Sequence, residues 1–210
     1  MRRQGETSYK DTSFGIIPRS KLIPLEIEGI KRAWDFVLAS RKRGKIPITP
    51  GFILKTHKAG FGWIFPKTAG RYRSLDVRVS NYEPPKFYLL PQLMLNFTND
   101  LNIRMKHIPL IDDESFFEEL VGLLAWAHHQ FLWIHPFNDY NGRIGRLLIN
   151  MILLNLDLPP AELEVETRSG RKKYVEALGA ADQGNNKKLE KLIYSALKEA
   201  LRNLDQNRKT

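Results

Sequence analysis

The sequence contains no cysteine, which excludes disulfide bonds, thiolate metal sites and cysteine nucleophiles. It also lacks a hydrophobic run long enough to span a bilayer, because the longest one, LLINMILLNL at 147–156, is short and interrupted by asparagine. The first fifteen residues carry positive charge, but no apolar segment follows them as it would in a secretory signal. These absences predict a cytoplasmic protein that does not insert into a membrane.

Acidic residues are too few to balance the basic ones, since 23 Asp and Glu face 33 Lys and Arg and leave a net charge of +10. A field of this sign attracts polyanions and phosphorylated ligands, so a nucleotide and a nucleic acid are both candidate partners. Most of these charges are expected to form an ordinary solvated surface. The sequence shows no arrangement suited to reading bases and no P-loop, so we do not expect a nucleic-acid partner.

Alternation typical of β-strands is scarce and is convincing only in LDVRV at 75–79, where it predicts a short hairpin. Elsewhere the apolar residues recur at helical spacing, and the length fits one domain. The first 24 residues look like a poorly ordered N-terminal arm. Helices are expected over about 25–40, from 50 onward, and over 92–105, 112–134, 142–156, 171–182 and 186–204. The chain is therefore predicted to be mainly α, with one small β insertion.

The stretch HPFNDYNGR at 135–143 concentrates chemically active side chains between two predicted helices. Backbone N–H groups of Asn141, Gly142 and Arg143 would point out of the second helix, and a helix N-terminus is a ready anion site. Arg143 and Arg146 are three residues apart and share one helix face, which presents two guanidinium groups to phosphate oxygens. This part of the stretch predicts a phosphate-binding site.

Two further residues of the stretch supply an acid–base group and a metal ligand. His135 titrates near neutral pH, so it is the candidate general base for a hydroxyl. Asp139 is a lone carboxylate among phosphate binders, where Mg²⁺ usually bridges protein and nucleotide. Phe137 is expected to insert into the core and fix the loop. Together these residues predict transfer of a phosphoryl or nucleotidyl group to a hydroxyl.

The segment HPFNDYNGRIGR resembles the signature of Fic-domain proteins, with Tyr140 as the one departure, where that pattern has Gly or Ala. AHHQFLWIHPF resembles the family's approach helix, TAGRYR the segment before its flap, and YVEALGAADQGN its C-terminal part. The resemblance implies a Fic-type helical bundle over residues 25–205, followed by a short tail at 206–210. It also implies a motif loop at 135–146 and a β-hairpin flap at about 75–88.

The resemblance further implies an enzyme that uses Mg²⁺ to transfer AMP from ATP to a Ser, Thr or Tyr hydroxyl of a target protein. His135 would deprotonate that hydroxyl, and Asp139 would hold Mg²⁺ against the α- and β-phosphates. The flap would clamp the unidentified target as an added strand.

The resemblance assigns the phosphates to four residues of the motif. Asn141 and Gly142 would line the anion pocket, while Arg143 and Arg146 would hold the β- and γ-phosphates. Tyr140 leaves alternatives open, because a bulky side chain there could crowd the α-phosphate, point outward or stack on a ligand ring. Another nucleotide, phosphocholine or phosphate as the transferred group therefore stays a candidate, as does a non-catalytic regulator that binds nucleotide or nucleic acid.

A second resemblance concerns self-inhibition. Many Fic proteins carry a helix with Ser or Thr, three residues, Glu and then Gly or Asn, and PLEIEG at 24–29 is similar except for Pro24. By this resemblance Glu28, within a segment at 24–40, would pair with Arg146 and compete with a phosphate. The alternatives are that Glu28 is an ordinary exposed glutamate, or that a separate antitoxin inhibits the protein. The last amphipathic helix is equally able to pack within the chain or against a second copy.

Overall fold

The computed structural model describes residues 9–79 and 82–207, and this part of the chain forms seven α-helices, one short 3-10 helix and one β-hairpin. The prediction of a mainly α fold is confirmed. The elements are β1 (Tyr9–Thr12), β2 (Gly15–Pro18), α1 (Arg19–Arg41), α2 (Pro50–Phe61), η1 (Phe87–Leu89), α3 (Leu90–Lys106), α4 (Phe116–Ile134), α5 (Asn141–Asn155), α6 (Arg168–Ala181) and α7 (Lys187–Asn207).

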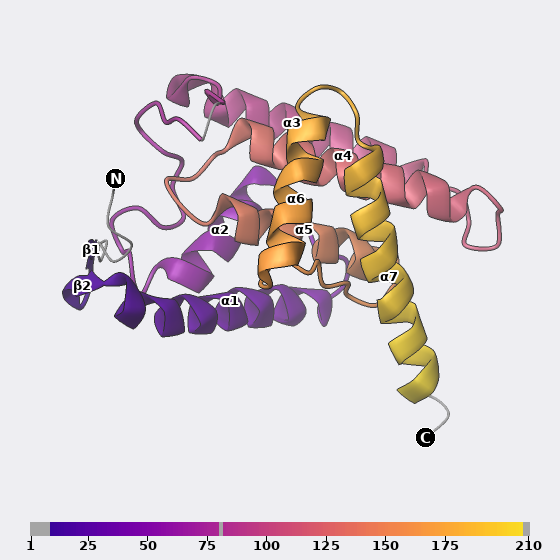
Figure 1. Ribbon diagram of the computed structural model, residues 1–210, viewed down its shortest axis with the longest axis horizontal. Helices are drawn as coiled ribbons and strands as arrows, with labels where there is room; N and C mark the ends of the chain where they lie inside the picture. Colours follow the sequence, from indigo (N-terminus) through magenta and orange to yellow (C-terminus); the bar gives the residue numbers. More distant parts are fainter. Residues whose placement is uncertain (1–8, 80–81, 208–210) are drawn as a thin grey trace.

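Helix α5 lies at the centre of the bundle, between α1 along one side and α3 and α4 along the other (Figure 1). Ten of its fifteen residues are buried, so it is apolar around most of its circumference, as expected for a central helix. Helices α6 and α7 lie side by side in the foreground, and α7 packs on α4 and α6 of its own chain (Figure 1). No helix in the described ranges is both long and apolar enough to cross a membrane.

The expected N-terminal arm is wrong for residues 9–24. These residues form the antiparallel hairpin of β1 and β2, with Tyr9 opposite Pro18, and then the first turns of α1. The first helix was expected from about residue 25, but α1 begins at Arg19 and contains Pro24, which has no N–H and therefore leaves one backbone hydrogen bond unmade. Residues 1–8 lie outside the described part of the chain. So does most of the expected tail, because α7 continues to Asn207.

Helix α1 turns an unexpected face to the core. Its buried residues follow helical spacing but are mostly small or polar, whereas Ile27 is 53% exposed. The reason is a close crossing with α2: a Cβ on Gly29 would lie 2.8 Å from the carbonyl oxygen of Gly60, closer than real Cβ atoms come. Only glycine lets the two backbones approach in this way. The buried residues of α1 are Leu22, Glu26, Gly29, Ala33, Val37 and Ser40.

The predicted hairpin at 75–88 is not a regular one. Residues 75–79 form no strand, and the described residues of this segment share one isolated antiparallel bridge, between Val79 and Tyr82. Leu75 of LDVRV is 71% exposed, so the alternating side chains do not form a buried face. Without such burial, the alternation does not stabilise a strand there. The only sheet within the described ranges is the N-terminal one.

Candidate active site

The motif loop begins where α4 ends. His135 adopts a left-handed backbone conformation, with φ 50° and ψ 60°, and its N–H donates to the carbonyl of Phe131 to cap the helix. A non-glycine residue rarely adopts this conformation, so the surrounding contacts must hold it. The cap turns the chain away from the α4 axis directly before Pro136.

A buried arginine outside the motif supplies much of that support. Arg73 is 1% exposed, its backbone N–H donates to the carbonyl of Pro136 at 2.9 Å, and its Nε donates to the carbonyl of His135 at 2.9 Å. Its two terminal nitrogens donate to the carbonyls of Leu75 and Pro85. One guanidinium group therefore joins the motif loop to both ends of the expected flap.

Two residues fix the middle of the loop: Phe137, which is buried in the core, and Asn141, which hydrogen-bonds to the backbone of Phe137. Phe137 is fully buried, as predicted, and stacks on His57 with ring centroids 3.9 Å apart. The Asn141 amide donates to the carbonyl of Phe137 and accepts from its N–H, at 2.8 and 2.9 Å. The His57 ring accepts from the N–H of Gly70 and donates to the carbonyl of Asp139. Burial lowers the pKa of His57 to about 4, so it is a neutral structural group.

Helix α5 starts from a second left-handed residue, Tyr140, with φ 65°. The N–H of Arg143 donates to the Tyr140 carbonyl, so the expectation of three free N–H groups is wrong for this residue. Among the hydrogen bonds of the described residues, none uses the N–H of Asn141 or Gly142. Two donors of the helix N-terminus thus remain for an anion.

The predicted site residues come together around one cavity of about 390 Å³. Additional residues from α1 and α6 complete its wall, among them Arg19, Glu26 and Tyr174. The cavity brings a histidine, a carboxylate, a helix N-terminus and several guanidinium groups within one small volume. The sequence-predicted residues in its lining are His135, Asp139, Asn141, Gly142, Arg143 and Arg146.

His135 is held in the form that accepts a proton. Burial lowers the pKa of its imidazole, and the nearby positive charge of Arg73 lowers it further. The ring is therefore neutral at pH 7. A neutral imidazole beside an anion site is suited to general-base work.

Asp139 is half-exposed at the mouth of the cavity. One carboxylate oxygen accepts from the N–H of Tyr140 at 2.9 Å, and the other lies 3.3 Å from Lys10 Nζ on β1. In the described ranges no cluster of three or more His, Cys, Asp or Glu residues could hold a metal ion. A single carboxylate fits Mg²⁺ that keeps water and substrate phosphates as its other ligands.

Tyr140 points into the protein rather than toward solvent or a free ligand face. Its ring stacks on Phe61 with centroids 3.8 Å apart and planes 9° from parallel. Its hydroxyl donates to Oε1 of Glu26 at 3.0 Å. Burial raises the pKa of this phenol, and the charge of Glu26 adds to the effect, so the hydroxyl stays protonated and remains a donor.

The glutamate that reaches the site is Glu26 and not Glu28. Glu26 Oε2 accepts from Arg143 Nη2 at 2.9 Å, and Oε1 accepts from Arg19 Nη1 at 2.9 Å as well as from Tyr140. Glu28 is about half-exposed and pairs with Arg32 one turn along α1. The expected contact with Arg146 is wrong because residues two apart in a helix face different sides. The Gly29 crossing sets which side faces the core.

Arg146 lies beside a buried polar pair. The Nε2 of His128 is 2.7 Å from the hydroxyl of Tyr174, and both side chains are buried. Burial lowers the pKa of His128 to about 4, so it is neutral. Burial also raises the pKa of Tyr174 to about 12, against the opposing charge of Arg146. Tyr174, the member of this pair that lines the cavity together with Arg146, is thus held in place by a fully buried partner.

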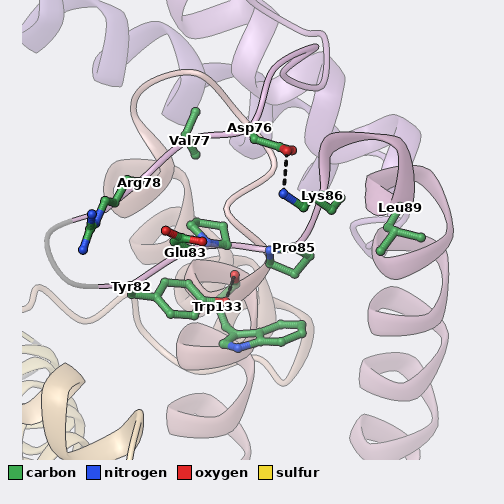
Figure 2. A pocket seen from close by; sticks show the side chains of 10 residues that line it. Asp76, Val77, Arg78, Tyr82, Glu83, Pro85, Lys86, Leu89 and Trp133 are labelled. Atoms are coloured by element: carbon green, nitrogen blue, oxygen red, sulfur yellow. Dashed lines mark hydrogen bonds and ion pairs between the residues drawn. The ribbon is translucent and has the colours of Figure 1, made fainter.

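A second cavity, of about 620 Å³, lies between the two arms of the flap segment and the end of α4. Figure 2 shows Asp76 and Lys86 facing each other across it, joined by an ion pair of 2.9 Å, with Trp133 and Tyr82 along its floor. The Tyr82 hydroxyl donates to the carbonyl of Trp133 at 2.9 Å. The flap is thus fastened to the same helix end that carries His135.

A family model described as the Fic/DOC family matches residues 47–153, which include the whole motif loop and all but the last two residues of α5. The chain belongs to the Fic/DOC family. Solved structures agree on the fold: Fic-1 from C. elegans is 26% identical with a TM-score of 0.68, over 88% of this chain and 51% of that one. BepC from Bartonella tribocorum, solved with bound AMPPNP, is 17% identical with a TM-score of 0.71, over 91% and 93%.

Curated Fic relatives are similar along most of this chain. The protein adenylyltransferase Fic of Nematostella vectensis is 31% identical over 175 residues, which is 83% of this chain and 38% of the relative. That of Drosophila erecta is 32% identical over 176 residues, 84% and 33%. The chain therefore spans about a third of the length of these relatives.

Sequence reasoning gave no role to five residues that contribute to the site: Lys10, Arg19, Glu26, Arg73 and Tyr174. Three of them lie in segments with a family resemblance (Glu26 in PLEIEG, Arg73 in TAGRYR and Tyr174 in YVEALGAADQGN), but the resemblance did not single them out, because each acts from a segment distant from the motif loop. A signal was present for Glu26, since it lies on one helix face with Leu22, Gly29 and Ala33 and so had to be buried with a partner.

Proposed function

We propose that this chain transfers AMP from ATP to a hydroxyl group of a target protein. The observation that carries the proposal is the shared cavity, which a neutral, partly buried His135 lines together with the N-terminus of α5 and two motif arginines. The names of the adenylyltransferase relatives and the nucleotide analogue bound to the Bartonella structure support ATP as the donor.

The reaction follows from these positions. His135 accepts the proton of the target hydroxyl, whose oxygen then attacks the α-phosphorus of ATP. The bond between the α-phosphorus and its bridging oxygen breaks, and pyrophosphate leaves. Arg143, Arg146 and the free N–H groups of Asn141 and Gly142 stabilise the charge on the phosphates.

Asp139 would hold Mg²⁺, which when bound neutralises phosphate charge and helps the leaving group depart. The flap segment would present the target. Its cavity is lined by Trp133, two residues before His135, and among the hydrogen bonds of the described residues none uses the N–H of Asp76, Val77 or Glu83, which favours an extended peptide as ligand. Asp139 lines the motif cavity, and the flap segment meets the end of α4 that precedes His135, so both assignments are compatible with one site.

Self-inhibition forms part of the proposal, with Glu26 in the role that the resemblance gave to Glu28. Its carboxylate occupies one nitrogen of Arg143 that a phosphate would use, and Tyr140 and Arg19 hold it there. A phosphate must therefore displace a buried carboxylate. A charge-assisted bond of this kind is worth about 1.5–3 kcal/mol.

The test compares four proteins in cell lysate with Mg²⁺ and ATP labelled at the α- or the γ-phosphate. They are the wild type, Glu26→Gln, Glu26→Gln with His135→Ala, and Glu26→Gln with His107→Ala. His107 is an exposed histidine at the end of α3, so its variant controls for loss of a histidine as such.

Protein-bound α-label that requires His135 but not His107 would establish AMP transfer. Its acid limb should lie below pH 6.5, because burial lowers the pKa of His135 and the proton must be absent for the base to act. His135-dependent γ-label alone would mean phosphate transfer instead. No His135-dependent label from either position would reject ATP as the donor.

A further inference from the structure

The hairpin of β1 and β2 is a weakly held unit beside the site. Its strands are four residues long, and Tyr9, Phe14 and Ile16 are 62%, 57% and 73% exposed. A two-stranded hairpin with so little buried surface is marginal in water. Its position therefore depends on contacts with the rest of the chain.

Contacts at the turn hold the hairpin on the segment that follows α2. The N–H of Ser13 donates to the carbonyl of Ile64 at 2.8 Å, and its hydroxyl donates to the carbonyl of Trp63. Phe14 packs edge-on against the Trp63 ring, which Arg32 covers at 4.1 Å. With the turn fixed there, β1 reaches the motif loop.

The residue that β1 brings to the loop is Lys10. Its Nζ lies 3.3 Å from Oδ2 of Asp139, with the two side chains 47% and 48% exposed. The N–H of Tyr140 occupies the other oxygen, Oδ1. A divalent cation on this carboxylate would thus meet a positive charge at the oxygen that it needs.

We propose that Lys10 competes with the divalent cation for Asp139, so that the hairpin is a displaceable cap on the metal end of the site. The inference rests on the proposed function, because the cation is the one that accompanies the nucleotide. The same continuous segment, through α1, places Glu26 on Arg143. It therefore sets a positive charge where the metal belongs and a negative charge where a phosphate belongs.

The exposure of the Lys10–Asp139 pair sets the expected size of the change in metal-dependent binding. A half-exposed lysine–carboxylate pair is weak, so removing the lysine should improve metal-dependent binding by about fivefold at most. The effect should shrink at about 0.5 M salt, because exposed charges are screened. Opening must break the Lys10 pair, the contacts of Ser13 and Phe14 and the packing of Ile17 on the core, a small set of contacts that suits an element of low local stability.

The experiment uses the Glu26→Gln background, in which Arg143 is released, and measures AMPPNP binding by calorimetry with Mg²⁺ and with EDTA. The compared proteins carry native Lys10, Lys10→Met, Lys10→Arg or Lys188→Met. Lys188 is an exposed lysine on α7, so its variant controls for the loss of one positive charge. The measured quantity is the ratio of the two dissociation constants, without and with Mg²⁺.

Lys10→Met should raise this ratio about two- to fivefold, while Lys10→Arg and Lys188→Met stay at the parent value. An unchanged ratio in Lys10→Met would overturn the proposal and leave an incidental surface pair. Weaker binding in both conditions would overturn it too, and would make Lys10 a phosphate ligand. If the Glu26→Gln parent binds no AMPPNP, the proposed function fails and this inference with it, which is a different outcome from a flat ratio.

Discussion

On its α1 side the motif loop meets a fully buried carboxylate shared by three donors, whereas on its flap side it meets an open cavity edged by exposed charges. The α1 side is closed by Glu26 and Tyr140. On the flap side, the buried Arg73 donates hydrogen bonds to the flap backbone, and the side chains of Asp76 and Lys86 are exposed to solvent. A buried ion pair must be broken to admit a ligand, while an exposed one rearranges at little cost.

This difference suits the α1 side of the loop to regulating ligand binding and the flap side to admitting a ligand. In the proposed reaction, nucleotide phosphates would compete with Glu26 of α1 for Arg143, whereas a target peptide at the flap would meet no buried carboxylate among the described residues. The comparison predicts that substitutions on the α1 side raise activity. Substitutions beneath the flap should lower stability and activity together.

The largest effect is expected from Arg73→Met. This change leaves the carbonyls of His135, Leu75 and Pro85 without their donor, and unsatisfied buried groups cost about 1–3 kcal/mol each. We expect the free energy of unfolding to fall by about 3 kcal/mol, measured by urea denaturation. Arg202→Met, which removes an exposed arginine from α7, should change it by less than about 0.5 kcal/mol. A similar loss of unfolding free energy in both variants would contradict the role assigned to Arg73 in holding the motif loop and the flap.

Glu26→Gln should have the next largest effect, in the opposite direction. Glutamine keeps the size and an acceptor for Tyr140 but removes the charge that engages Arg143. Affinity for AMPPNP with Mg²⁺ should rise about 10- to 100-fold, as the loss of a charge-assisted bond implies. Calorimetry measures it, and unchanged affinity would show that Glu26 does not compete with phosphate.

Tyr140→Phe isolates the hydroxyl. The ring still stacks on Phe61, but Glu26 loses one of its donors. Affinity for the same analogue should rise about two- to tenfold, in keeping with a single neutral donor. A fall in affinity would instead show that the hydroxyl serves the nucleotide.

Glu28→Gln is expected to have the smallest effect, within about twofold of wild type, because an exposed i, i+4 pair contributes little. It serves as the matched control for Glu26→Gln on the same helix. A rise equal to that of Glu26→Gln would mean that Glu28 is the inhibitory residue and that α1 rotates before nucleotide binds.

The sequence was sufficient for most of the helices, for the motif loop and for the six motif residues around the cavity, because helical periodicity and the loop's composition are local signals. It failed for α1, where the buried face carries Glu26 and Gly29 and the exposed face carries Ile27. Burial there is decided by the backbone crossing at Gly60, and no window of the sequence contains both partners. Tyr140 was unexplained for the same reason, since its stacking partner, Phe61, and its acceptor, Glu26, both come from distant helices.

The contact between Gly29 and Gly60 also limits how α1 can move. A helix that touches its neighbour backbone to backbone cannot roll about its axis without driving a side chain into that neighbour. Glu26 can therefore leave Arg143 by turning its side chain or by lifting the turns before Gly29, while the rest of α1 stays in place. Gly29 thus fixes the position of α1 at the crossing. The part of α1 that can move is the part before Gly29, which follows the hairpin of β1 and β2.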